Sequence, residues 1–357
     1  MKLRICLVLL LALLLCGCSS HNQETLPPTV PSTTEATTEP TTEPTTVPTE
    51  PEPEIRHPLT GEVLDEPLTN RIFGVSIGNS WDSLPHYGVS EADILFESFV
   101  NGHTTRRFAL YSDIASVEAI GGSRSMRMQF TDLSLGYDAV AVYAGGSETV
   151  IGDLNMSGVH GIISQRWGET YHWREEGKVY EHALMVNGAG LLEYAVNQGW
   201  HVTQPEDKDY GLQFAEEAAP IGGEDADVVS IHFVLGSTDK ETLFTYDPEL
   251  GTYRLSQYNT ECVDAYYDVP ETFKNVFLLL CENQNTGVYH VVNTVGSGEG
   301  WFACGGKYIP INWSRPTVHD AFTYTTVSGE ALELGVGNSY VCIMPTESQV
   351  EFSAEAE

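Results

Sequence analysis

The pattern of apolar and polar residues divides the chain into three stretches. Residues 5–15 form an unbroken apolar run, and residues 19–54 contain almost no apolar side chains. From residue 56 onward, short apolar runs alternate with glycine, asparagine and aspartate. The first run is too short to span a bilayer permanently. The folded part of the protein is therefore expected to begin near residue 56.

In the first half of the folded part, strand-like and helix-like stretches alternate. Strands are expected at 71–77, 94–96, 106–111 and 138–143. The second and third of these are expected to form a hairpin around Asn101-Gly102. Helices are expected at 127–135, where apolar residues recur at spacings of four and three, and around 191–196. The alternation predicts an α/β-type sandwich domain at 56–201.

The second half contains short runs rich in Val, Tyr, Thr and Phe. These runs predict a β-rich domain at 227–346, with a buried strand at 276–281 and a tight turn at Gly296–Gly300. The acidic, proline-containing stretch 202–226 is interpreted as an interdomain linker, and 347–357 as an acidic tail. The predicted fold class is α+β, with an N-terminal α/β-type sandwich domain followed by a β-rich C-terminal domain.

The N-terminus has the pattern of a secretory signal. Two basic residues, Lys2 and Arg4, precede the apolar run, and a signal peptide is expected at 1–17. The sequence Leu15-Cys16-Gly17-Cys18 resembles a bacterial lipobox, which implies that Cys18 is diacylated and becomes the mature N-terminus. The alternative is an ordinary signal peptide with an incidental cysteine. Two acyl chains give stable anchoring, so we expect an extracytoplasmic protein anchored to the outer face of the membrane.

Residues 18–55 are expected to form a disordered stalk. The segment repeats Thr-Thr-Glu-Pro, and its frequent prolines favour extended polyproline II over a packed core. Such a stalk would carry a folded head away from the lipid.

The chain has a formal net charge of -33. From residue 56 onward it still contains 43 acidic and 15 basic residues, so the stalk accounts for little of this charge. A strongly acidic head repels nucleic acid, which is therefore excluded as a partner. The charge favours cationic partners, although solubility alone is an alternative explanation.

Four cysteines lie in the last third of the chain, at positions 262, 281, 304 and 342. An extracytoplasmic location permits disulfides between them, whereas the apolar runs around Cys281 and Cys342 are typical of free buried thiols. None has the C-x-x-C spacing of a zinc or redox site. Their pairing stays open at this point.

Several short motifs in the folded part occur in an order and spacing that resemble those of a known family. They are Asn70-Arg71-Ile72-Phe73, Ser90-Glu91-Ala92-Asp93-Ile94, Gly122-Ser123-Arg124-Ser125-Met126-Arg127, Gly145-Gly146-Ser147, Tyr246-Asp247-Pro248, Gly306-Lys307 and Trp313-Ser314-Arg315. In these motifs the chain resembles the YerB-like lipoproteins, a two-part family of extracytoplasmic proteins in Gram-positive bacteria. The resemblance implies a fold and a location, but it names no activity.

Arg124 and Arg127 are the strongest candidates for a binding site. They follow the turn Gly121-Gly122-Ser123 and lie three residues apart at the start of a predicted helix, where both are expected on one face. Free amides and two guanidinium groups there would hold a carboxylate or phosphate. The alternative is a structural role, in which the arginines pair with supporting acids, namely Glu91, Asp93 and Glu97.

Two further candidates belong to the same predicted domain. Gly146 and Ser147 end a predicted strand, where α/β sheets bind ligands, although Ser147 also suits a helix cap. His182 falls in a family motif and is expected as a polar site residue. Its separations from His172 and His160 match no zinc template, so no metal or cofactor is expected.

No catalytic constellation is singled out. The turn Gly122-Ser123-Arg124-Ser125 lacks the second glycine of a G-x-S-x-G nucleophile elbow, and the many acids do not single out a catalytic pair. We therefore expect a non-catalytic module that binds an envelope component or envelope protein. A hydrolase or transferase acting on cell-wall material is the alternative, and the oligomeric state is left open.

Overall fold

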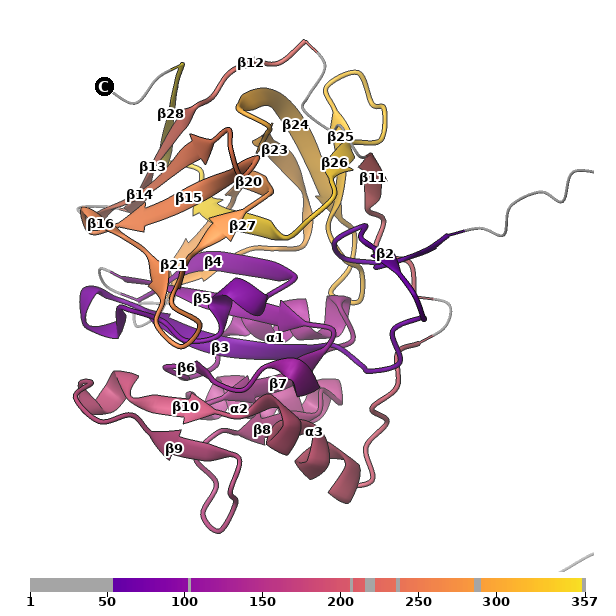
Figure 1. Cartoon of the computed structure of the whole chain (residues 1–357), viewed down its shortest axis with the longest axis vertical. Helices are drawn as coiled ribbons and strands as arrows, with labels where there is room; N and C mark the ends of the chain where they lie inside the picture. The colour runs from indigo at the N-terminus through magenta and orange to yellow at the C-terminus, as the bar shows by residue number, and fades with distance from the viewer. Residues whose placement is uncertain are drawn as a thin grey trace, which may run out of the picture. The chain divides into compact units, whose positions relative to one another are not determined.

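A mixed sheet of eleven strands runs through this computed structural model, which describes residues 54–101, 104–205, 208–215, 222–235, 238–285 and 290–354 (Figure 1). Cys18 and the predicted stalk up to residue 53 lie outside the described residues. The neighbouring strands are, in order, β12 (Glu224–Asp225), β24 (Lys307–Arg315), β23 (Gly296–Cys304), β20 (Asn275–Cys281), β27 (Ser339–Pro345), β4 (Ile94–Asn101), β5 (Thr104–Tyr111), β3 (Phe73–Asn79), β7 (Val140–Tyr143) and β8 (Gly161–Ile163), with β25 (Thr323–Thr326) beside β24.

The sheet joins the two halves of the chain between β4 and β27. These strands pair in parallel, from Ile94 opposite Ser339 to Ser98 opposite Ile343. Pro53–Glu357 accordingly form one compact unit. The sequence is divided into predicted domains at 56–201 and 227–346, but strands from both of these ranges belong to this one sheet.

A second sheet, of six strands, packs on one face of the first. Its strands are β16 (Thr260–Glu261), β15 (Thr252–Gln257), β14 (Thr238–Asp247), β13 (Val228–Leu235) and β28 (Gln349–Ser353), with β19 (Thr272–Phe273) beside β15. Phe99 of β4 meets Phe233 of β13 at a ring separation of 5.9 Å. Strand β28 lies within the segment predicted as an acidic tail and pairs with β13.

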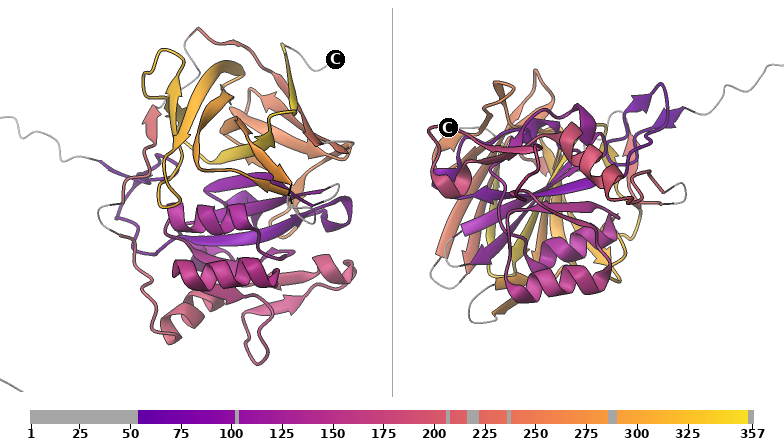
Figure 2. Two further views of the ribbon diagram at one scale, coloured as in Figure 1. Left: turned by 180° about the vertical axis from the view of Figure 1, so that it is seen from behind. Right: turned by 90° about the horizontal axis from the view of Figure 1, so that it is seen from below.

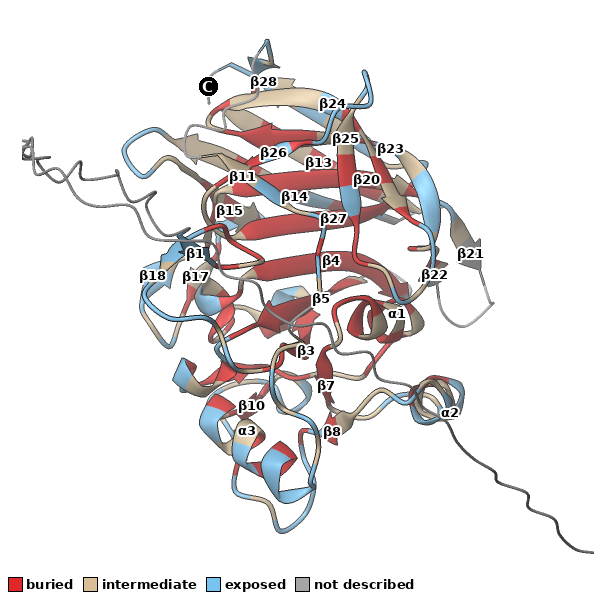
Figure 3. Cartoon of the chain, turned by 90° about the vertical axis from the view of Figure 1, so that its right-hand side faces the viewer, coloured by how far each residue is buried: buried red, intermediate tan, exposed pale blue. Residues whose placement is uncertain are grey.

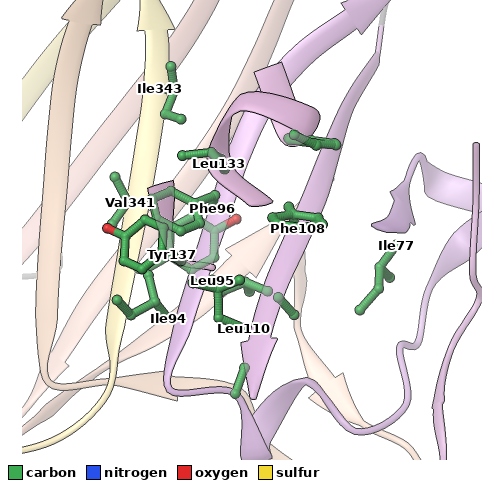
Figure 4. Packing of buried hydrophobic residues seen from close by; sticks show 14 of the residues in the cluster. Ile77, Ile94, Leu95, Phe96, Phe108, Leu110, Leu133, Tyr137, Val341 and Ile343 are labelled. Carbon is green, nitrogen blue, oxygen red and sulfur yellow. The ribbon is translucent and has the colours of Figure 1, made fainter. Parts of the chain in front are cut away.

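The opposite face of β4 is covered by α1 (Met128–Gly136). Phe96 contacts Tyr137 at 5.6 Å between ring centroids, and Figure 4 shows Leu133 and Tyr137 close to Phe96 and Val341. Because β4 is buried on both faces, its apolar residues at 94–96 and 99–100 do not alternate with polar ones, and the two polar residues between them, Glu97 and Ser98, are buried as well. The centre of the sheet is correspondingly buried in Figure 3.

Two more helices, α2 (Glu148–Ser157) and α3 (Gly188–Asn197), complete the N-terminal part. Figure 2 shows α2 running beside α1. Nearby lies a three-stranded sheet of β6 (Ile120–Gly121), β10 (Leu184–Val186) and β9 (His172–Arg174). The remaining strands form pairs, which are β1 (Ile55–Arg56) with β2 (Val63–Leu64), β11 (Gln213–Ala215) with β26 (Glu333–Gly335), β17 (Val263–Asp264) with β18 (Val269–Pro270), and β21 (Asn283–Asn285) with β22 (His290–Val292).

The predicted α+β class is confirmed, but the predicted turn at Gly296–Gly300 is wrong, because these residues belong to β23. A Cβ at Gly300 would lie 2.3 Å from the carbonyl oxygen of Leu278 on β20, so close packing of strands explains this glycine. None of the helices among the described residues has both the length and the apolarity needed to cross a membrane.

The four cysteines of the C-terminal part are free and buried. Of the two possibilities that the sequence left open, the structure therefore shows the buried thiol. Burial raises the pKa of Cys262 to about 12, which keeps this thiol protonated and unreactive at neutral pH.

Candidate functional site

Arg124 and Arg127 do not share a helix face. Helix α1 begins at Met128, and Arg127 precedes it in an extended conformation with φ −134° and ψ 156°. The Arg127 side chain is only 9 % exposed and donates to the Met126 carbonyl at 2.9 Å. Arg124 is half-buried and donates to the Glu181 carbonyl at 2.8 Å. The expected shared face is wrong because the helix starts one residue after Arg127.

Arg124 instead lines the same cavity as Arg174, which lies 50 positions away in the sequence. Both side chains line a cavity of about 210 Å³, together with Ser123, Gln165, Tyr180 and Glu181. We call it the arginine pocket. Strand β10 places both arginines there, because Leu184 pairs with Arg174 while its carbonyl accepts from the Ser123 amide at 2.7 Å.

The glycine turn before Ser123 allows this close approach. A Cβ at Gly122 would lie 2.1 Å from the His182 carbonyl oxygen, and one at Gly121 would lie 2.5 Å from the Met185 sulfur. The buried Ser123 hydroxyl lies 2.8 Å from the Ser164 hydroxyl. The turn is thus explained by packing against η4 (Tyr180–His182) and β10, and Ser123 contributes to the wall of the pocket.

Neutral groups hold both guanidinium groups in place. Arg174 donates to the Tyr180 carbonyl at 2.6 Å and to the Gln165 amide oxygen at 3.2 Å, and it lies 3.7 Å from the centre of the Tyr180 ring. Burial lowers the pKa of Arg124, and the charge of Glu181 opposes that shift. Since neutral acceptors do not cancel charge, the pocket keeps two fixed cations beside one exposed carboxylate, Glu181.

His182 lies next to the arginine pocket. Its Nε2 atom is 3.2 Å from the Ser80 hydroxyl, and its Nδ1 atom is buried with no hydrogen-bond partner in the described part of the chain. A Ser-His-Asp triad needs a carboxylate at that second nitrogen. Burial, followed by the charge of Arg124, lowers the pKa of His182 to about 4. The imidazole is therefore neutral at pH 7 and adds no charge to the site.

Gly146 and Ser147 lie outside the arginine pocket. Ser147 caps α2, where its hydroxyl accepts from the Val150 amide at 3.3 Å. Ala144, two residues before Gly146, does line the pocket, and its amide donates to the Arg124 carbonyl. The capping role therefore accounts for Ser147 in this structure.

The three supporting acids contact other partners. Glu97 pairs with Lys240 at 2.5 Å, Asp93 lies 3.3 Å from His57, and Glu91 accepts from the Ser90 hydroxyl at 3.2 Å. Arg124 reaches the Glu181 carbonyl and none of these carboxylates. In the described residues, no three His, Cys, Asp or Glu side chains lie close enough together to hold a metal ion.

Sequence reasoning missed Arg174, Gln165 and Tyr180. The only available signal was the scarcity of basic residues, with 17 in 357, which makes every arginine in the head a candidate. The pairing of β9 with β10 selects Arg174 among them, and this pairing is visible only in the fold.

Comparisons with known proteins place most of the head in one family. Residues 59–201 match the "Protein of unknown function (DUF3048) N-terminal domain", and residues 229–341 match the corresponding C-terminal domain. The chain is 22% identical over 255 residues to "Putative lipoprotein YerB" of Bacillus subtilis (strain 168), covering 71% of this chain and 74% of that protein. The crystal structure of YerB from Bacillus subtilis covers 84% of this chain and 100% of its own, with a TM-score of 0.73 at 20% identity. On these matches the chain belongs to the YerB-like family and contains both of its DUF3048 domains.

Proposed function

We propose that this protein is a lipid-anchored, extracytoplasmic binding module that holds an anionic group of an envelope component in the arginine pocket. The observation that carries the proposal is the pair of guanidinium groups, from Arg124 and Arg174, that line one cavity while neutral acceptors hold them. Two fixed guanidinium groups suit the bidentate recognition of a carboxylate or phosphate. The chain has a net charge of -33, so a pocket lined by two positive charges differs in sign from the protein as a whole.

The anchor is proposed at Cys18. The lipobox-like Leu15-Cys16-Gly17-Cys18 and the similarity to a Bacillus subtilis protein named as a lipoprotein support it. Metabolic labelling with a fatty acid should mark the wild-type protein and leave Cys18→Ala unmarked. Equal labelling of both proteins would exclude this anchor.

The pocket is tested by cosedimentation of the full chain, solubilised in detergent, with isolated cell-wall material. We expect Arg124→Gln/Arg174→Gln to reduce the bound fraction at least about fivefold, because each lost ion contact weakens binding by about 1 kcal/mol or more. Lys208→Gln/Lys307→Gln is the matched control, since it removes two partly exposed cations that lie outside the arginine pocket, and it should bind as the wild type does. Equal loss in both double variants would contradict the proposal.

The same experiment separates binding from hydrolysis or transfer. His182 does not line the cavity that the carboxylates of Asp82, Glu175, Glu176 and Glu261 line, which favours binding. Release of soluble wall fragments by the wild type, abolished by a single substitution such as Asp82→Asn or Glu176→Gln, would instead establish the enzymatic alternative.

A further inference from the structure

A second cavity, which we call the acidic groove, lies on the other side of the segment that carries the arginine pocket. It has a volume of about 720 Å³ and is lined by Trp81, Asp82, Leu84, Pro85 and Tyr87 together with residues 175–179 and 260–263. Val179 lines the groove, whereas Tyr180 and Glu181, which follow it, line the arginine pocket. The volume falls in the range of sites for small molecules or side chains.

The charge of the groove is opposite to that of the arginine pocket. Four carboxylates line it, from Asp82, Glu175, Glu176 and Glu261, against the single cation Lys178. Glu261 is paired with Arg254 at 3.2 Å, and Glu175 accepts from the Trp173 indole at 2.9 Å. Asp82 and Glu176 are exposed and form no ion pair in the described residues. The groove thus offers two uncommitted negative charges.

Aromatic rings supply the apolar part of the groove. Trp81 is 57 % exposed although it packs edge-on against Tyr258 at 6.2 Å, so much of its indole is open to a ligand. Tyr87 forms another part of the lining. Aromatic faces beside carboxylates recognise ammonium groups through cation–π attraction and ion pairing together.

The chain already places one ammonium group in this groove. Lys178 Nζ lies 5.5 Å from the centre of the Tyr87 ring and donates to the carbonyls of Pro85 and Ser83 at 2.5 Å and 3.4 Å. Lys178 is half-buried, and this burial lowers the pKa of its ammonium group. Lys178 shows that an ammonium group can lie in this groove. Within the described residues, its ammonium group does not contact Trp81, Asp82 or Glu176, so these three side chains can bind a second cation.

We propose that the acidic groove binds the lysine side chain of a peptide partner, with the ammonium group between Asp82 and Glu176 and the aliphatic stem against Trp81. The stalk of this chain is not the occupant, because residues 19–54 contain glutamates and neither lysine nor arginine. The site differs from the arginine pocket in ligand charge, so each site can fail its test without the other.

Calorimetric titration of the detergent-solubilised full chain with the peptide acetyl-Gly-Lys-Gly-Lys-Gly-amide tests this site. We expect saturable binding that is lost when both lysines are Nε-acetylated. Asp82→Asn/Glu176→Gln and Trp81→Ala should each weaken binding at least about fivefold, because the ion pairs and the cation–π contact are removed. Arg124→Gln should leave the affinity for this peptide unchanged.

The matched control is Glu148→Gln/Glu193→Gln, which changes the net charge equally at exposed positions of α2 and α3. It should bind the peptide as the wild type does. Equal weakening in both double variants, or equal binding of the acetylated peptide, would overturn the proposal. Self-association that Asp82→Asn/Glu176→Gln abolishes would also overturn it, since a second copy would then occupy the groove.

Discussion

Glu97 and Arg107 lie directly opposite each other on β4 and β5, yet each forms its ion pair with the C-terminal half of the chain. Glu97 pairs with Lys240 at 2.5 Å and Arg107 pairs with Glu271 at 2.7 Å. Gln257 connects the two pairs, donating to Glu97 at 3.0 Å and accepting from Arg107 at 3.3 Å. Both Glu97 and Arg107 are fully buried, so this network joins the two sheets and is closed to a ligand.

Removing one member of a buried pair should strongly destabilise the head. Glu97→Gln and Lys240→Met should each lower the free energy of unfolding by about 3–5 kcal/mol, because the remaining charge stays buried without its partner. The double variant should lose less than the sum of the two. Urea unfolding measures all three, with Asp225→Asn as the control. That variant breaks the exposed Asp225–Lys307 pair and should cost at most about 1 kcal/mol. A similar cost for Glu97→Gln and Asp225→Asn would contradict a structural role for the network.

Stability should fall as the pH is lowered from 7 to 4. Burial lowers the pKa of His86 and that of His182, the latter to about 4. As the pH falls through 6.5, these histidines therefore bind protons in the unfolded chain but stay neutral in the folded chain, which favours unfolding. For Glu97 and Glu271, burial alone would raise the pKa, but Lys240 and Arg107 respectively hold it below its usual value. The stability that these carboxylates contribute is therefore present above about pH 4.5 and lost below it.

The contribution of His182 to this profile can be isolated. We expect the melting temperature of His182→Gln to fall less steeply than that of the wild type between pH 6.5 and 4. In the wild type, the imidazole resonances of His182 in NMR spectra should titrate with a midpoint near pH 4. A midpoint near 6.5 would show that the ring is not protected by burial.

Two glycines should respond to alanine in opposite directions. Gly300→Ala should lower the free energy of unfolding by at least about 2 kcal/mol, because its Cβ would lie 2.3 Å from the backbone oxygen of Leu278. Gly152→Ala, within α2, meets no atom within 4 Å and should raise stability by about 0.5–1 kcal/mol. Chemical denaturation of both variants tests the pair, and destabilisation by Gly152→Ala would show that α2 needs this glycine for another reason.

The buried thiols should be unreactive until the head unfolds. Treatment with iodoacetamide followed by peptide mass mapping should find Cys262, Cys281, Cys304 and Cys342 unmodified in the native protein and all four alkylated in urea. Disulfide-linked peptides, or alkylation without urea, would contradict the free, buried state.

The local pattern of the sequence predicted several elements and one hairpin, but not the strand pairings between distant parts of the chain. The hairpin of β4 and β5 and helix α1 follow from glycine-flanked apolar runs and from helical spacing, which depend on neighbouring residues. The pairing of β4 with β27 joins residues about 245 positions apart, and no local signal specifies it. The same limit applies to the site, where Arg124 was found by its motif and Arg174 only through the pairing of β9 with β10.

Arg124 and Arg127, which the sequence presents as one pair, should differ when each is replaced by alanine. Arg127 is 9 % exposed, so its loss leaves a large unfilled volume next to α1 and should lower the free energy of unfolding by at least about 2 kcal/mol. Arg124 is half-buried and loses mainly its hydrogen bond to the Glu181 carbonyl, which is worth about 1 kcal/mol. Thermal unfolding of the two variants measures the difference, and binding to cell-wall material should weaken for Arg124→Ala under conditions where that variant is fully folded. If Arg124→Ala proved as destabilising as Arg127→Ala, Arg124 would be a structural residue, and the arginine pocket would lose its main support as a binding site.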